Sequence, residues 1–200
     1  MPMHPAPPTD LQGLVSAFEH TVQAVVDLGQ SCSRSDFDLQ TECPGWSVKD
    51  VISHVVGIES WLDGARPPQV ELPKLPHVKN EVGEFVELFV EERRPLDGAD
   101  IVGELEDVLV SRMSALRDPA LTDESVLRGI FGPAPATQAL TLRVIDIWVH
   151  EQDIRAALGR PGNLDSPAAA LFVSAIIRSL PRVVARDAAV PSGQVVILDI

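Results

Sequence analysis

The sequence contains little cysteine and comparatively little positive charge. Its 200 residues include two cysteines, Cys32 and Cys43, whose spacing fits neither a zinc ribbon nor a disulfide framework. A reducing cytoplasm is therefore the expected location. Lysine and arginine total 16 against 29 aspartates and glutamates, which gives a formal net charge of -13. Because such a chain repels a phosphate backbone, nucleic acid is not an expected partner.

The sequence also lacks a long apolar run. Its most apolar stretch, residues 168–177, is followed by Arg178 and is shorter than the ~20 residues that a membrane span needs. Residues 1–9 contain four prolines and no apolar run flanked by positive charge, so we expect a disordered lead-in rather than a signal peptide. We expect a soluble protein, monomeric or homodimeric, with no membrane partner.

Helical periodicity dominates what remains. Apolar residues recur every three or four positions, and Ser, Asp, Pro and Gly mark the segment ends. The predicted helices cover residues 11–28, 48–62, 81–93, 99–116, 137–158 and 167–186. Prolines between residues 67 and 76 predict a long crossover after the second helix. The pattern predicts an all-α four-helix bundle, whose core includes the last helix and which residues 81–116 extend or cover.

The predicted helix over residues 137–158 carries a polar stripe where a bundle helix is normally apolar. Arg143, Asp146, His150 and Asp153 are spaced three, four and three residues apart, with apolar residues on both sides. Charged groups in this position are expected to point between helices, where they need partners. Asp146 and His150 stand one turn apart, as two ligands of one metal ion do on a helix.

His54 is the best candidate for a third ligand, because it lies within the apolar stripe of the second predicted helix. Two histidines and one carboxylate would leave one position open, as in catalytic zinc sites, and nickel or iron would also suit these ligands. In the alternative reading, His150 is a core histidine hydrogen-bonded to Asp146 or Asp153 without a metal. The spacing alone leaves both readings open.

Other polar and aromatic residues are expected to have structural roles. We expect Cys43 to be structural rather than an activated thiol, and the acidic run of residues 81–92 to be a solvated helix face. Trp46 is expected to hold its loop against the bundle, although an aromatic here would also suit a pocket wall. The remaining histidines are expected to be solvated: His4, His20 and His77.

Two segments resemble a known family. They are residues 41–54, TECPGWSVKDVISH, and residues 143–155, RVIDIWVHEQDIR, followed by GRPG at 159–162. In this order they resemble the mycothiol-dependent maleylpyruvate isomerase family of the DinB-like superfamily, over nearly the whole chain. The resemblance implies a DinB-like bundle that binds a divalent metal, usually zinc. The ligands that it implies are His54, Asp146 and His150.

The resemblance also implies an activity. Mycothiol would bind as a thiolate at the open metal position and attack a small electrophilic substrate, in a transferase or isomerase reaction. Asp153 or Glu151 would orient a ligand or accept a proton, and Arg143 or Arg155 would bind a substrate carboxylate. Asp146 stands where the isomerase itself is expected to have the longer glutamate, which changes the reach of the carboxylate.

Family members carry a smaller α/β domain after the bundle. The β-branched residues 194–200 are expected to be its first strand, with no partner strand after it. The expected organisation is a lead-in over residues 1–9, the metal-binding bundle over 10–190, and the start of the α/β domain over 191–200. Two other functions stay open: a non-catalytic metal- or ligand-binding module, and a hydrolase whose metal activates water.

Overall fold

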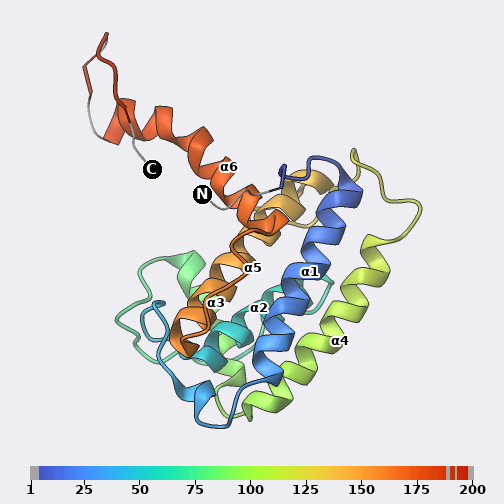
Figure 1. Ribbon diagram of the computed structural model, residues 1–200. Coiled ribbons are helices and arrows are strands. Elements are labelled where there is room, and N and C mark those ends of the chain that lie inside the picture. The colour runs from blue at the N-terminus through green and yellow to red at the C-terminus, as the bar shows by residue number, and fades with distance from the viewer. Residues whose placement is uncertain (1–4, 188–189, 192, 198–200) are drawn as a thin grey trace.

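A computed structural model describes residues 5–187, 190–191 and 193–197 (Figure 1). Helices dominate it, so the all-α prediction is confirmed, and the first five helices begin and end within two residues of the expected bounds. The helices are α1 (Leu11–Gln30), α2 (Val48–Leu62), α3 (Glu81–Arg93), α4 (Gly98–Leu116), α5 (Ala136–Leu158) and α6 (Pro167–Arg182).

The bundle consists of α1, α2, α4 and α5. Helix α1 packs against both α4 and α5, and α2 packs against α3, α4 and α5 (Figure 1). The expectation that the last helix belongs to the core was wrong, because α4 buries a full stripe and α6 buries only its first turn. The α4 stripe comprises Ile101, Leu105, Leu109 and Met113.

Local signals fix the helix that carries the candidate metal ligand His54. The Ser47 hydroxyl accepts a hydrogen bond from the Asp50 backbone N–H, while the Asp50 carboxylate accepts one from the Ser47 backbone N–H. This capping box satisfies two N–H groups that a helix start otherwise leaves unpaired. It sets the beginning of α2 and thereby places His54 two turns into the bundle.

A short hairpin that the sequence did not predict lies between α4 and α5. Strand β1 (Val126–Leu127) pairs antiparallel with β2 (Ala134–Pro135), directly before α5 begins. The connection is a tight turn in which the backbone N–H groups of Gly129 and Gly132 each donate to the other's carbonyl oxygen at 3.1 Å. The turn requires glycine at position 132, where φ is +106°.

Beyond its first turn, α6 projects away from the bundle (Figure 1). It contains Pro181 and then passes into a π-helical turn, Val183–Asp187. The helical segment of residues 167–186 is sufficient by length and composition to cross a membrane, although its most apolar stretch in the sequence is shorter than a membrane span. Only 22% of its most apolar 18 residues are buried in this structure. Core helices of soluble proteins can have the same length and composition.

The ends of the chain differ from the expectation in one respect. The strand expected over residues 194–200 is wrong for residues 194–197, which have no regular structure. An extended segment without a neighbouring strand leaves its backbone groups unpaired, and no partner strand is present among the described residues. Residues 1–4 of the lead-in and residues 198–200 lie outside the described part, and the expected domain boundaries stay predictions.

Candidate metal centre

Helices α2 and α5 bring the three candidate ligands together. His54 Nε2 lies 3.6 Å from Asp146 Oδ2, and His150 Nε2 lies 4.0 Å from Asp146 Oδ1. The ring centroids of the two histidines are 4.8 Å apart. In a tetrahedral zinc site with bonds of about 2.0–2.2 Å, ligand atoms lie roughly 3.3–3.6 Å from one another. A small closing movement would therefore bring all three donor atoms to one ion.

His54 has the properties of a metal ligand. Its side chain is 6% exposed, and neither ring nitrogen has a hydrogen-bond partner within the described part of the chain. Burial lowers the pKa of His54 to about 4, so the imidazole is neutral at physiological pH and offers a lone pair. Buried polar atoms without partners are rare in native proteins. A metal at Nε2 would supply one of the two missing partners.

Asp146 is held in place by a buried chain of charges. Arg143 Nη1 donates to Asp146 Oδ2 at 2.8 Å, and Arg143 Nε donates to Glu59 Oε1 at 2.6 Å. Glu59 also accepts a hydrogen bond from Arg112 Nε at 3.0 Å. Burial favours a higher pKa for Asp146, but the Arg143 guanidinium together with His54 and His150 outweighs it and holds that pKa well below its usual range. The carboxylate is therefore ionised, as a metal ligand must be.

Asp153 orients the second histidine. Its Oδ2 lies 3.2 Å from His150 Nδ1, which leaves His150 Nε2 facing Asp146 and His54. A carboxylate that accepts a hydrogen bond from the second ring nitrogen is the usual support of a histidine ligand. Burial favours a higher pKa for Asp153, but its hydrogen bonds with His150 and Cys43 lower it overall. Asp153 is therefore better suited to orienting His150 than to accepting a proton.

Cys43 belongs to this cluster, which the sequence reasoning missed. Its Sγ donates a hydrogen bond to Asp153 Oδ2 at 3.2 Å and lies 3.9 Å from His150 Nδ1. Burial, reinforced by Asp153, raises the pKa of the Cys43 thiol to about 12. The side chain therefore stays protonated and acts as a donor rather than as a nucleophile. Its position directly before the Pro-Gly-Trp turn into α2 was the available signal.

Trp46 both packs its loop onto the bundle and walls the site. Its ring centroid lies 5.0 Å from that of His54, and its Nε1–H donates to Glu87 Oε2 at 2.8 Å. The expected solvation of two residues was wrong: Glu87 is buried, and His77 is 17% exposed with Nε2 3.1 Å from Glu87 Oε2. Arg94 Nη2 lies 2.8 Å from Glu87 Oε1, and this ion pair offsets the free-energy cost of burying the Glu87 carboxylate.

Arg155 and Glu151 are not brought to the cluster. Arg155 Nε donates to Glu151 Oε1 at 2.6 Å, and Asn163 donates to both oxygens of the same carboxylate. Arg155 instead borders a surface hollow beside α1, together with His20. His20 is exposed, as expected. The expected catalytic role of Arg155 and the substrate-binding role of Arg143 stay predictions, and Arg143 is engaged by two carboxylates.

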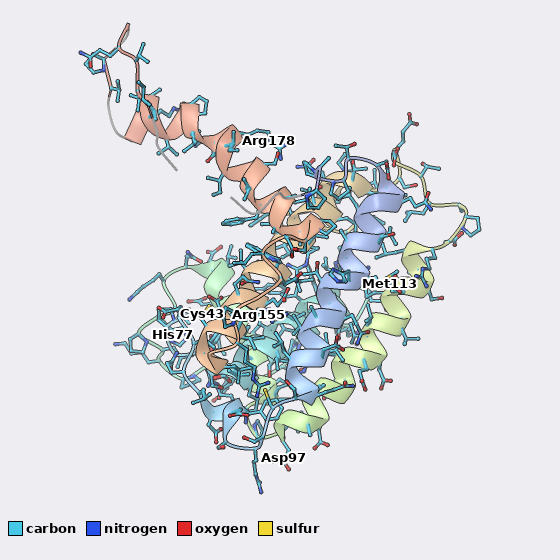
Figure 2. The ribbon with its side chains drawn as sticks, viewed as in Figure 1. Cys43, His77, Asp97, Met113, Arg155 and Arg178 are labelled. Carbon is cyan, nitrogen blue, oxygen red and sulfur yellow. The ribbon has the colours of Figure 1, made fainter. Side chains whose placement is uncertain are left out.

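Two cavities adjoin the cluster. One, of about 360 Å³, is bordered by His54, Arg143 and Asp146 and extends toward the β1–β2 turn. The other, of about 730 Å³, lies where Cys43, Trp46 and His77 meet, on the side where Figure 2 labels Cys43 and His77. Val86 of α3 lines both cavities.

The residues of the candidate metal centre lie within a segment that matches a known protein family. The family model of the mycothiol maleylpyruvate isomerase N-terminal domain matches residues 18–155, which contain all three candidate ligands. The chain belongs to this family. The resemblance noted in the sequence is thereby confirmed. No curated protein matches the chain.

Several solved structures share the helical fold of this chain. The mycothiol-dependent maleylpyruvate isomerase aligns with a TM-score of 0.53 and 14% identity, over 72% of this chain and 60% of its own. An uncharacterised protein from Escherichia coli UTI89 aligns with a TM-score of 0.58 and 15% identity, over 76% and 95%. At these identities the likeness shows the fold alone, and this chain spans 60% of the isomerase's length.

A third neighbour is the colibactin self-resistance protein ClbS, solved in complex with double-stranded DNA. It aligns with a TM-score of 0.57 and 10% identity, over 78% of this chain and 99% of its own. The DNA contact belongs to ClbS. For the present chain, with its net charge of -13, the absence of a nucleic-acid partner stays a prediction.

Proposed function

We propose that this protein binds one divalent metal ion through His54, Asp146 and His150 and uses it in thiol chemistry. Mycothiol would be the cosubstrate, and the reaction a transfer to, or an isomerisation of, a small electrophile. The observation that carries the proposal is the His54 imidazole, which is buried, neutral and without a hydrogen-bond partner among the described residues. It faces a carboxylate and a second histidine, which are further metal ligands.

The ligand set suits a catalytic metal. Two histidine nitrogens and one carboxylate oxygen leave a coordination position open, as in catalytic zinc sites, and zinc is the metal that we propose. When bound, such an ion supplies Lewis acidity that lowers the pKa of a thiol at the open position. Because the cosubstrate must be a reduced thiol, we place the protein in the cytoplasm.

The protein's own residues would prepare this position. Asp153 fixes the orientation of His150, and Arg143 fixes Asp146 while keeping it ionised. Trp46 covers His54 and excludes water from one side. The Cys43 thiol donates to Asp153 Oδ2 and so supports the carboxylate that orients His150. In this arrangement the electrophile would approach through the smaller cavity, which His54 and Asp146 border.

Conversion of an electrophile with and without mycothiol tests the proposal. Zinc-loaded protein is incubated with maleylpyruvate and with a panel of small electrophiles, and products are quantified by chromatography. We expect conversion that requires mycothiol and that falls at least about 100-fold in His54→Ala, because a ligand is lost. The matched control, His20→Ala, alters an exposed histidine on α1 and is expected to retain the rate.

The other outcomes identify the competing functions. Conversion that proceeds equally well without any thiol would indicate a hydrolase in which the same site activates water. No conversion by a protein that demonstrably holds the metal would indicate a binding module.

A further inference from the structure

The smaller cavity has an unusual composition for a site that would bind organic acids. It occupies about 360 Å³ between α3, the β1–β2 turn and the first half of α5. His54, Arg143 and Asp146 form one end, where the proposed metal would lie. The walls away from this end are mostly apolar, contributed chiefly by Val82, Val86, Ile130, Phe131, Ala139 and Leu142.

The rim of this cavity exposes large apolar side chains. Phe131 is 80% exposed, Val82 48% and Leu142 47%. The reciprocal hydrogen bonds between Gly129 and Gly132 hold Phe131 in a tight turn at the rim. Covering such surface with an apolar ligand contributes roughly 25 cal/mol for each Å² removed from water, whereas a polar ligand would gain little from it.

The positive charge at the cavity is already neutralised. Arg143 is the one lysine or arginine among the residues lining this cavity, and it is engaged by Glu59 at 2.6 Å and by Asp146 at 2.8 Å. With Arg112, which pairs with Glu59, the group contains two cations and two anions. A substrate carboxylate placed against the apolar walls would therefore be buried without a compensating charge, which is costly.

Arg143 nevertheless retains an unpartnered nitrogen. Its Nη2 is buried and has no hydrogen-bond partner among the residues that the structure describes. The two N–H groups of this nitrogen can donate to an uncharged acceptor such as a carbonyl oxygen. The cavity thus combines apolar walls, one lining residue with a spare donor, and no unpaired cation among its described lining residues.

We infer that this cavity receives the uncharged, apolar part of the electrophile, an aryl or alkyl carbonyl compound whose reactive carbon faces His54 and Asp146. The inference rests on the proposed function and narrows its substrate class, because it excludes compounds that must place a carboxylate in this cavity. A volume of about 360 Å³ lies near the lower end of the range for small-molecule sites. The substrate body is accordingly small.

A pair of fluorinated probes of equal size tests this inference. Binding of 4-fluoroacetophenone and 4-fluorobenzoate is measured by fluorine NMR, on the purified protein and again after metal removal with a chelator. In the metal-free form we expect the ketone to bind at least about tenfold more tightly than the carboxylate, because no unpaired cation among the lining side chains would compensate the carboxylate charge. The probes carry no leaving group that a thiol displaces readily, so the measurement reports binding.

Two variants locate the binding. Leu142→Arg adds a guanidinium to the cavity wall and is expected to reverse the preference toward 4-fluorobenzoate. Val110→Arg makes the same change on α4, at a 71% exposed residue that does not line the cavity, and is expected to leave the preference unchanged. A preference for the carboxylate in the metal-free wild type, no binding of either probe, or an unaltered preference in metal-free Leu142→Arg would overturn the inference.

These results are separable from the proposed function. A protein that shows the ketone preference and the Leu142→Arg reversal, yet converts nothing with mycothiol, would retain this cavity assignment and lose the thiol chemistry. A protein that performs mycothiol-dependent conversion but prefers the carboxylate probe would retain the chemistry and lose the assignment.

Discussion

Glu59→Gln is expected to lower the free energy of unfolding by about 3–5 kcal/mol, because it removes the anion shared by two buried arginines. Glu59 is fully buried, and its two oxygens accept from Arg143 at 2.6 Å and from Arg112 at 3.0 Å. Glutamine has the same shape, so packing is preserved and the loss reports on charge. Urea unfolding followed by circular dichroism measures the change.

An exposed pair provides the control for this effect. Glu19 accepts hydrogen bonds from Arg117 at 2.7 and 2.8 Å, and both side chains are largely solvated. Glu19→Gln is expected to cost less than about 1 kcal/mol, because water screens the exposed pair. If the two variants lost equal stability, or if Glu59→Gln remained as stable as the wild type, the buried charge chain would not be holding Asp146 in place.

Asp153→Ala is expected to weaken zinc binding about 10–100-fold, because His150 loses the carboxylate that orients it. The expectation depends on the 3.2 Å contact between Asp153 Oδ2 and His150 Nδ1, which fixes the ring with Nε2 toward the other ligands. Competition with a chromophoric chelator measures the dissociation constant. Asp153→Asn retains an acceptor oxygen and is expected to recover part of the affinity.

The control for this change is Asp107→Ala, which removes an exposed carboxylate from α4. It is expected to bind zinc as tightly as the wild type. An unchanged dissociation constant in Asp153→Ala would mean that His150 is oriented by other contacts, and an equal loss in Asp107→Ala would point to a general effect of net charge.

The bundle and its polar cluster could be predicted from the sequence because both depend on local spacing. Helical periodicity places Asp146, His150 and Asp153 on one stripe of α5, and burial of the stripe around His54 follows from the apolar residues beside it. The structure places these side chains next to one another. Their binding of a metal ion stays a prediction.

The surroundings of the cluster could not be predicted, because they depend on contacts between distant segments. Cys43 is hydrogen-bonded to Asp153, 110 residues later in the sequence, and Trp46 is hydrogen-bonded to Glu87, 41 residues later. Helical spacing on α3 predicted that Glu87 belongs to an acidic, solvated face. Nothing in the neighbouring sequence indicates that the loop carrying Trp46 will cover it. In the same way, α4 rather than α6 is a core helix because its apolar stripe packs against α1 and α2, and such contacts between distant segments cannot be read from local spacing.

The metal content of the purified protein, measured by mass spectrometry after zinc reconstitution, tests the central claim most directly. It is compared with His54→Ala and His150→Ala, and with His20→Ala as the control. We expect about one zinc per chain in the wild type and in His20→Ala, and loss of that ion in the other two variants. A wild type that takes up no metal, or a His54→Ala variant that retains the ion, would contradict the assignment of His54, Asp146 and His150 as its ligands.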